Sequence, residues 1–358
     1  MTMADHACTG KCPVIAHRKP YYAELRAGRS YLWCSCGRSQ RQPFCDGRSH
    51  EGTGFLPVRY TAQADGEEVL FCGCKHTSTA PFCDGAHSNL PGGYSDATDG
   101  ADVPRPDLVS ADATGVSRVD GRCFAVSPEH GADLSLRYAL RTIVGPSLGA
   151  EHQSQFHLRL EDGETPILAA EGVDTILWIM AGNGTIAIGD RSFAVTAPCG
   201  AYVRAGEAFR LAAGTPLRAY VSACPAVEAL IELAEMPAAF DAAWPDRVVS
   251  IDEEERTAMG PRWFQMLVDK RIGSTTAAQF IGHIPRSRAE MHRHLYEEAL
   301  IIMSGEGIIW NETSAARVGP GDVIFFPRKH LHSLECIAPE GMDVVGLIHP
   351  GDNPGVNY

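Results

Sequence analysis

The N-terminal quarter of the chain carries one cysteine pattern twice. The first copy starts at Cys34 and the second starts at Cys72, 38 residues later. Both copies read Cys-x-Cys at the start, Ser or Thr at the sixth position and Pro-Phe-Cys-Asp-Gly at the end, so eight positions match without a gap. Closely spaced thiols at fixed intervals are typical of metal sites. The repeat therefore predicts two similar metal sites in one small module.

The composition agrees with metal binding by free thiols. The chain has 12 cysteines, no positively charged start followed by an apolar segment, and no apolar run near the length that a membrane span needs. We therefore expect a cytoplasmic protein without a membrane partner, in which thiols stay reduced. The net charge of −13 and the lack of a basic stripe argue against nucleic acid as a partner.

Composition also divides the chain into three domains and two short connections. The segment after the cysteine repeat is rich in Asp, Pro and small residues and has no helical or strand period, which is typical of a linker. The remainder consists of short apolar runs between Gly and Pro turns, which predicts barrels or sandwiches of β-strands. We predict a mostly β protein with a cysteine module (1–95), an acidic, proline-containing linker (96–117), a first barrel (118–224), a connecting helix (225–245) and a second barrel (246–358).

Two patterns support this division of the body. Val227, Leu230 and Ile231 recur at helical spacing, which is why a helix is expected between the barrels. The sequence Ile-Met-Ala-Gly-Asn-Gly, which ends at Gly184, matches Ile-Met-Ser-Gly-Glu-Gly, which ends at Gly307. This internal match indicates that the body is one β domain that has been duplicated.

A group of possible metal ligands stands in the second barrel. Residues two apart in a strand point to the same face, so His292 and His294 point together, where Glu298 and His332 can join them. Three imidazole nitrogens and one carboxylate oxygen suit divalent Fe, Mn, Co, Ni, Cu or Zn and leave positions open for a further ligand. The spacing does not distinguish among these metals.

With its flanking glycines and proline, this group resembles the cupin superfamily, whose motifs are G-x5-H-x-H-x3,4-E-x6-G and G-x5-P-x-G-x2-H-x3-N. The resemblance implies two double-stranded β-helix (jelly-roll) barrels, a bicupin, in which these four residues hold the metal. Lys329 replaces a motif glycine, Cys336 replaces the motif asparagine, and no glycine stands six residues before the first histidine. None of these departures removes a ligand.

The first barrel is predicted to have lost the metal site. When Gly182 is aligned with Gly305, the four ligand positions fall on residues that do not form a comparable donor set. We expect this barrel to serve for packing, as a dimer interface or as a wall of the pocket. The aligned residues are Ala169, Glu171, Thr175 and Arg210.

The cysteine repeat leaves two kinds of metal site open. Three thiolates and one histidine suit an iron–sulfur cluster, and they also suit a closed zinc site. The repeat resembles the CDGSH iron–sulfur family, whose pattern C-x-C-x2-[ST]-x3-P-x-C-D-G-x-H is met in full by the second copy. The resemblance implies cluster ligands Cys72, Cys74, Cys83 and His87 in the second copy and Cys34, Cys36, Cys45 and His50 in the first.

The first copy departs from the pattern by one extra residue before His50. In the CDGSH family, proteins with a single motif pair as dimers with one [2Fe-2S] cluster per motif. This chain resembles such a dimer fused into one polypeptide, so we expect two [2Fe-2S] clusters. His87 is the better-supported histidine ligand, and His50 is expected to reach its cluster through a bulged loop.

Together the two resemblances predict a cupin oxidoreductase, a non-haem Fe(II) oxygenase or dioxygenase of a small organic substrate, with His292, His294, Glu298 and His332 as its catalytic metal ligands. The clusters would relay electrons or keep the metal reduced. One alternative is an iron–sulfur sensor, or an electron- or cluster-transfer protein, with a ligand-binding cupin. Another is a non-redox isomerase or decarboxylase that uses Mn or Zn instead of Fe.

Further expectations concern the pocket and the partners. We expect a small-molecule substrate, an electron-donor protein and a homodimer as partners. Cys336 stands two strand steps beyond His332 and is expected on the same face. The candidate pocket residues are Gln265, Gln279, His283, Arg286, Tyr296, His330 and Cys336.

Overall fold

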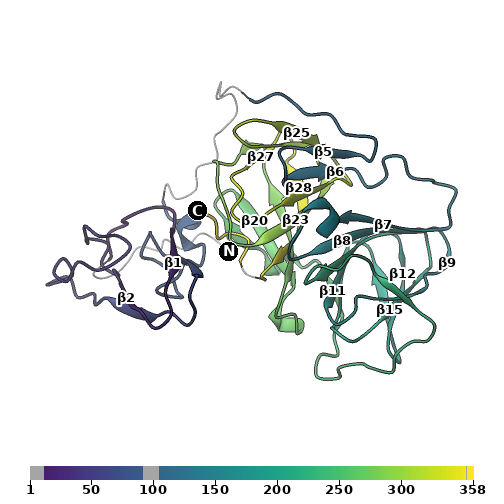
Figure 1. The fold of residues 1–358 in the computed structure, drawn as a ribbon, viewed down its shortest axis with the longest axis horizontal. Coiled ribbons are helices and arrows are strands. Elements are labelled where there is room, and N and C mark those ends of the chain that lie inside the picture. Colours follow the sequence, from purple (N-terminus) through teal and green to yellow (C-terminus); the bar gives the residue numbers. More distant parts are fainter. Residues whose placement is uncertain (1–11, 92–104, 352) are drawn as a thin grey trace.

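The computed structural model describes residues 12–91, 105–351 and 353–358, and antiparallel β-strands dominate it. A small N-terminal module lies beside a body of two β barrels (Figure 1), which confirms the mostly β prediction. In the described ranges, no helix is long and apolar enough to cross a membrane. The helical segments there are 3-10 turns: η1 (Ala86–Asn89), η2 (Pro146–Leu148), η3 (Glu253–Glu255) and η4 (Lys270–Ile272).

The N-terminal module interleaves the two copies of the cysteine pattern. Strand β2 runs into the first copy and β4 runs into the second, yet β1 pairs with β4 and β2 pairs with β3. The buried Trp33 side chain of β2 donates a hydrogen bond from Nε1 to the Cys72 carbonyl (2.9 Å), so the copies share one core. The strands are β1 (Tyr21–Leu25), β2 (Ser30–Trp33), β3 (Val58–Thr61) and β4 (Glu67–Phe71).

Two sheets form the first barrel, and alternation of apolar and polar residues along their strands fills its interior. One sheet has the order β18-β14-β11-β16-β8-β7, and the other has the order β13-β12-β15-β10-β17 with β9 beside β15. The strands are β7 (Tyr138–Val144), β8 (Ser154–Leu160), β9 (Gly163–Glu164), β10 (Ile167–Ala169), β11 (Asp174–Ala181), β12 (Asn183–Ile188), β13 (Arg191–Thr196), β14 (Cys199–Val203), β15 (Phe209–Ala213), β16 (Leu217–Cys224), β17 (Ile231–Leu233) and β18 (Val248–Ser250).

The second barrel has a larger sheet, β19-β20-β21-β28-β23-β26-β6-β5, and a smaller one, β22-β27-β24-β25. Its core holds aromatic and aliphatic side chains from both sheets. The strands are β5 (Val116–Arg118), β6 (Phe124–Val126), β19 (Thr257–Met259), β20 (Arg262–Val268), β21 (Ala278–Ile284), β22 (Ser287–Arg288), β23 (Glu297–Ser304), β24 (Gly307–Trp310), β25 (Ala315–Val318), β26 (Val323–Phe326), β27 (Ser333–Cys336) and β28 (Met342–His349).

The two barrels exchange strands, so the predicted boundaries at residues 118 and 246 are wrong in detail. Strand β6 was placed in the first barrel but pairs with β26 of the second. Strand β18 was placed in the second barrel but pairs with β14 of the first. Hydrophobic periodicity marks a strand without showing which sheet edge it joins, which explains the error. The exchange ties the barrels into one body.

The predicted connecting helix is absent. Residues 225–245 have no helix, and strand β17 within them pairs with β10 to extend a sheet of the first barrel. Pro237 interrupts the helical pattern, because proline lacks the N–H group that a helix interior needs. A pairing partner on the sheet edge therefore outweighs the weak helical periodicity of this segment.

The described part of the predicted linker, residues 105–117, lies along the second barrel. Val109 N–H donates to the Ala315 carbonyl (2.8 Å), and Ala315 N–H donates to the Asp107 carbonyl (3.1 Å). Arg105 Nε also donates to Glu335 Oε2 (3.1 Å). This half is therefore part of the folded body, while residues 96–104 of the prediction lie outside the described residues.

The matched turns predicted from the internal repeat have the same backbone geometry. Gly182 has φ +89° and Gly305 has φ +78°, a conformation that residues with a side chain rarely adopt. A Cβ at these positions would lie 2.2 Å from the Pro216 carbonyl oxygen and 2.4 Å from the Gly341 carbonyl oxygen. The same steric demand at both turns explains why the glycines match.

Candidate metal centre

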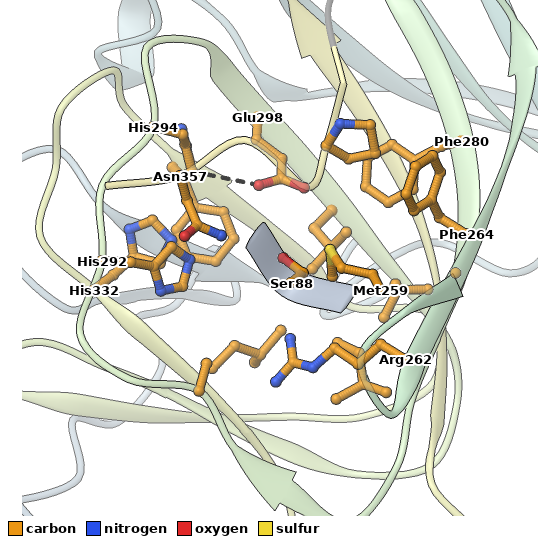
Figure 2. Close-up of a pocket in the computed structure, with 18 of the residues that line it drawn as sticks. Ser88, Met259, Arg262, Phe264, Phe280, His292, His294, Glu298, His332 and Asn357 are labelled. Atoms are coloured by element: carbon orange, nitrogen blue, oxygen red, sulfur yellow. Dashed lines mark ion pairs between the residues drawn. The ribbon is translucent and has the colours of Figure 1, made fainter. Parts of the chain in front are cut away.

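The four predicted donor side chains of the second barrel line one cavity (Figure 2). His292 N–H donates to the His332 carbonyl (3.0 Å) and His332 N–H donates to the His292 carbonyl (3.1 Å), which holds the two segments side by side. Glu298 lies in β23, with its Oε2 3.4 Å from His294 Nε2. Strand pairing thus gathers donors that are distant in the sequence.

Each histidine of this group is oriented by its own backbone surroundings. The Nδ1 atoms of His292, His294 and His332 lie 2.8, 2.7 and 2.9 Å from the carbonyl oxygens of residues 290, 296 and 330. A carbonyl only accepts hydrogen bonds, so this network assigns the proton to Nδ1 and leaves the Nε2 lone pair for a metal. His294 Nε2 is buried and makes no hydrogen bond.

Aromatic packing holds the imidazole rings in place. The ring centroids of His292 and His332 are 4.5 Å apart, and those of His294 and His332 are 4.9 Å apart. His332 stacks on Phe326 and His294 stacks on Tyr296, both at 4.1 Å. Across the described residues, no three His, Cys, Asp or Glu side chains are drawn into a closed metal-binding group. The donors therefore line the cavity without forming a closed cage.

Burial sets the protonation states of the four donors. It lowers the pKa of His292 to about 4 and that of His294 to about 3, and it takes the pKa of His332 well below its usual value. The same burial raises the pKa of Glu298 to about 8. Neutral imidazoles are the form that binds a cation, and a buried carboxyl is ionised readily only beside a positive charge. This donor set fits a divalent metal ion.

The cysteine sites have the same arrangement in both copies. The Sγ atoms of Cys34 and Cys36 lie 3.6 Å apart, and those of Cys72 and Cys74 lie 3.5 Å apart. In each copy the third thiol faces the histidine instead, with Cys45 Sγ 3.3 Å from His50 Nδ1. The corresponding distance in the second copy, from Cys83 Sγ to His87 Nδ1, is 3.4 Å. Two thiols on one side and a thiol–imidazole pair on the other fit the two irons of a [2Fe-2S] cluster.

The extra residue in the first copy does not displace its histidine, because the loop before His50 absorbs it. Burial lowers the pKa of His87. In the second copy, the hydrogen bond from Cys74 lowers the pKa of the Cys72 thiol to about 6, while the pKa of Cys74 is raised. A thiol that ionises near neutral pH is ready to bind a metal.

The second copy of the cysteine pattern sits against the cavity of the second barrel. Asn89 Nδ2 donates to the Ala258 carbonyl (2.9 Å), and Gly260 N–H donates to Asn89 Oδ1 (3.0 Å). Asn353 Nδ2 donates to the Asp84 carbonyl (3.0 Å). These bonds fix η1 and the loop before it on strand β19 and the C-terminal segment.

As a result, the cavity has walls from two domains. Its volume is about 140 Å³, and His87, Ser88 and Lys19 of the N-terminal module line it together with the four donors. Figure 2 shows Ser88 in the middle of this site and Arg262 across from His292. Sequence reasoning missed these residues, because no local pattern shows that two domains will dock. The predicted cluster ligand His87 and the four candidate metal donors of the second barrel thus line one cavity.

The pocket residues predicted from sequence are only partly correct. His283 and Tyr296 line the cavity, and Tyr296 also donates a hydrogen bond to the Pro354 carbonyl (3.0 Å). Phe264 and Phe280 line it instead of the residues beside them, because neighbouring residues in a strand face opposite ways. The predicted residues that do not line the cavity are Gln265, Gln279, Arg286, His330 and Cys336.

The contacts of four of these residues show where they point. Gln265 Oε1 accepts from Asp252 N–H (3.0 Å), and Gln279 Nε2 donates to the Leu177 carbonyl of the first barrel (3.3 Å). His330 pairs with Asp120. The Cys336 thiol is buried, and its Sγ lies 3.7 Å from the Ala338 carbonyl oxygen.

The first barrel offers no comparable donor set. Its interior is filled by apolar side chains, including Phe209 and Leu211, which are fully buried. The strand register places Phe209, and not the predicted Arg210, at the position of His332, because Gly184 pairs with Ala213 as Gly307 pairs with Cys336. Arg210 pairs with Glu164 near the surface (3.1 Å). The packing agrees with a barrel that serves as a scaffold.

Two parts of the chain are similar to known proteins. Residues 283–347, which include the four donors, match the Cupin domain family. A 53-residue stretch is 53% identical to the mitochondrial CDGSH iron-sulfur domain-containing protein 3 of Mus musculus, covering 14% of this chain and 38% of that protein. The Homo sapiens protein of the same name is 52% identical over 52 residues, covering 14% and 40%. The chain thus spans about two fifths of the length of these relatives.

A solved structure supports the fold of the body. The protein Ylba from E. coli matches with a TM-score of 0.50 at 16% identity, covering 68% of this chain and 95% of that protein. Likeness at this identity concerns the fold alone. The chain therefore combines an N-terminal stretch that is similar to CDGSH iron-sulfur domain-containing proteins with a C-terminal segment that matches the Cupin domain family.

Proposed function

We propose that the protein is a metal-dependent cupin oxidoreductase in which an iron–sulfur module supplies electrons to the cupin site. The observation that carries this proposal is the shared cavity, which His87 lines together with His292, His294, Glu298 and His332. A cluster bound at His87 would have a short path for electrons to a metal held by the four donors, and a non-redox metal site has no use for such a path. Such docking therefore favours redox chemistry over a non-redox isomerase or decarboxylase.

The donors divide into two sets. The three imidazoles and Glu298 would hold a divalent ion, with iron as the proposed metal, and the two cysteine sites would hold [2Fe-2S] clusters. When bound, the clusters would supply single electrons, and iron would supply Lewis acidity and a redox partner for them. The docked N-terminal module also covers part of the cavity with Ser88 and Lys19, which limits the access of water.

The cavity supports a small acid as the substrate. Its volume of about 140 Å³ is close to the roughly 150 Å³ of a cavity that holds benzene. Aromatic and aliphatic side chains such as Phe264, Phe280 and Leu300 form much of its wall. Arg262, which is 9% exposed, places a cationic group at the same cavity, whereas the charge of Lys19 is paired with that of Glu290 (3.0 Å). We therefore propose an aromatic or branched aliphatic carboxylic acid of about six to ten heavy atoms, a size estimated from that cavity volume.

The test is anaerobic purification with metal quantification at each site, followed by oxygen uptake with a panel of small aromatic and aliphatic acids. We expect iron in the cupin and uptake that depends on the acid. Arg262→Gln should raise the KM for the acids at least tenfold while changing the KM for their neutral amides less than threefold. A cupin that turns over with Zn or Mn alone, or iron-loaded protein that no acid activates, would overturn the proposal.

The oxygenase reaction, the cytoplasmic location and the homodimer expected from the sequence stay predictions. An iron–sulfur sensor with a ligand-binding cupin would bind the same acids without oxygen uptake. The oxygen-uptake assay therefore separates that alternative from the proposed enzyme.

A further inference from the structure

The two copies of the cysteine pattern differ in what surrounds them. The second copy is docked on the cupin, whereas the first copy belongs to the outer part of the module, where β2 lies farther from the body than β1 (Figure 1). Exposed arginines stand at three positions of the first copy, and uncharged residues stand 38 positions later. The arginines Arg38, Arg41 and Arg48 correspond to His76, Thr79 and Ala86.

The backbone of Arg38 and Arg48 is held close to the first cluster site, and Arg41 stands in the loop between them. Arg38 N–H lies 3.4 Å from Cys36 Sγ. The carboxylate of Asp46 accepts from Gln40 N–H and from Arg48 N–H, both at 3.2 Å, which draws the two ends of the loop together. In the described residues none of the three arginine side chains forms an ion pair. We call Arg38, Arg41 and Arg48 the basic rim.

Apolar side chains are exposed beside the same site. Val14 is 46% exposed, Leu32 is 40% exposed and Leu56 is 76% exposed. Each is tied to the cysteine loop: Val14 N–H donates to the Cys36 carbonyl (3.0 Å), Cys45 N–H donates to the Leu32 carbonyl (2.7 Å) and Ser35 Oγ donates to the Leu56 carbonyl (2.7 Å). The counterpart of Leu32, Leu70, is 7% exposed. Exposed apolar groups with a charged rim are the ordinary composition of a transient docking surface.

We propose that the basic rim and these apolar side chains dock an acidic one-electron carrier protein, which delivers electrons at the first copy. This inference rests on the proposed function, because an electron supply needs an entry point. One electron leaves the reduced centre of the carrier and enters the site of Cys34, Cys36, Cys45 and His50; the carrier is oxidised by one electron and no bond forms or breaks. A positive patch on a chain of net charge −13 favours the approach of an acidic partner to that patch.

The test uses the full-length, cluster-loaded protein and a reduced plant-type [2Fe-2S] ferredoxin as the acidic carrier. Arg38, Arg41 and Arg48 are all replaced by Glu. The matched control replaces Arg122, Arg137 and Arg191 of the barrels by Glu, since these arginines are at least 50% exposed and the change in net charge is the same. The readouts are the Kd of the complex and the rate of cluster reduction followed by absorbance, with dithionite as a small reductant for comparison.

We expect the rim variant to bind the ferredoxin at least tenfold more weakly and to be reduced by it at least tenfold more slowly. Its reduction by dithionite should match the wild type, and the control should stay within twofold. Raising the salt concentration should slow the wild type and leave the rim variant nearly unchanged. Equal ferredoxin rates in the rim variant and the control would overturn the proposal, as would a wild-type protein that does not bind the ferredoxin.

These readouts do not involve turnover of a substrate. If the cupin reaction fails but the rim still governs reduction by the ferredoxin, the docking proposal survives and the proposed function does not. If the ferredoxin reduces the rim variant and the control variant at equal rates while acids still drive oxygen uptake, the docking proposal is wrong and the proposed function stands.

Discussion

At the residue scale, orientation and burial explain what the donors can do. The Nδ1 atoms of three histidines are used by backbone carbonyls, so each ring reaches the cavity with the nitrogen that binds metals. The carboxyl of Glu298 is buried beside them, and that burial raises its pKa to about 8. A divalent cation would reverse this shift by favouring the ionised form. The site is therefore organised for a cation before one arrives.

Two adjacent glutamates of β23 allow metal affinity and folding stability to be tested separately. Glu298 faces the cavity, whereas Glu297 accepts the backbone N–H groups of residues 151, 152 and 153 at 2.8, 2.9 and 3.1 Å. Glu298→Gln should weaken metal affinity at least tenfold with little loss of stability. Glu297→Gln should lower the free energy of unfolding by about 1–3 kcal/mol and leave the metal affinity unchanged. Calorimetric metal titration and urea unfolding measure both, and identical behaviour of the two variants would contradict the assignment.

His157 provides a pH test that is independent of the metal sites. It is 8% exposed and packs on Tyr220, and burial lowers its pKa from 6.5 to about 4. Below pH 6.5 the unfolded chain takes up a proton that the folded chain resists, so the stability contributed by this residue is lost as the pH falls toward 4. Relative to His157→Phe, the wild type should lose about 3 kcal/mol between pH 7 and pH 4. Parallel pH profiles for the two proteins in urea unfolding would count against this account.

At the scale of elements, the strand exchange joins the barrels. Phe124 on β6 is fully buried and packs on Phe325 of β26, with ring centroids 5.3 Å apart. Tyr220 of the first barrel donates from its hydroxyl to the Gly321 carbonyl of the second (2.7 Å). Each barrel therefore completes its packing with atoms that the other barrel supplies.

A single core substitution should report this dependence. Phe124→Ala should destabilise the protein by about 3–5 kcal/mol, as for other large aromatic truncations in cores. Because the chain crosses between the barrels after β6 and after β18, and the barrels pack on each other, both should unfold in one calorimetric transition that shifts as a whole. Two separate transitions, of which only one moves in the variant, would show that the barrels are independent.

The sequence predicts the elements of the site better than their assembly. Fixed spacing predicts the thiols, both histidines of the cysteine sites, and His292, His294 and Glu298, because these residues lie close together in the chain. His332 is predicted only through the motif resemblance, and strand pairing brings it beside His292. The matched turns at Gly182 and Gly305 were visible because a steric rule demands glycine there. Long-range sheet edges decide where β6 and β18 pair, so periodicity could not assign them. The cavity walls Lys19, His87 and Ser88 depend on docking, for which the sequence holds no local signal.

At the scale of the whole molecule, docking gives the two copies different places. Salt bridges from Lys19 to Glu290 (3.0 Å) and from Arg328 to Glu68 (3.2 Å) join the module to the cupin, in addition to the bonds of Asn89 and Asn353. Exposed pairs of this kind contribute little stability individually but fix orientation. The outer copy is left open to a carrier, and the inner copy borders the cavity. We therefore predict an electron route that enters at the first copy and leaves at the second copy.

The proposed function requires that electrons pass from the module to the cupin within one chain. One reducing equivalent of dithionite per chain, added anaerobically to protein with oxidised clusters and an oxidised cupin metal, is followed by absorbance and electron paramagnetic resonance. We predict first-order transfer whose observed rate constant does not change with protein concentration. Asn89→Ala combined with Asn353→Ala should lower this rate constant at least tenfold at unchanged cluster potential, whereas Glu51→Ala with Arg59→Ala on the module surface should not. An observed rate constant that rises in proportion to protein concentration, or equal rate constants in both double variants, would contradict electron transfer within one chain.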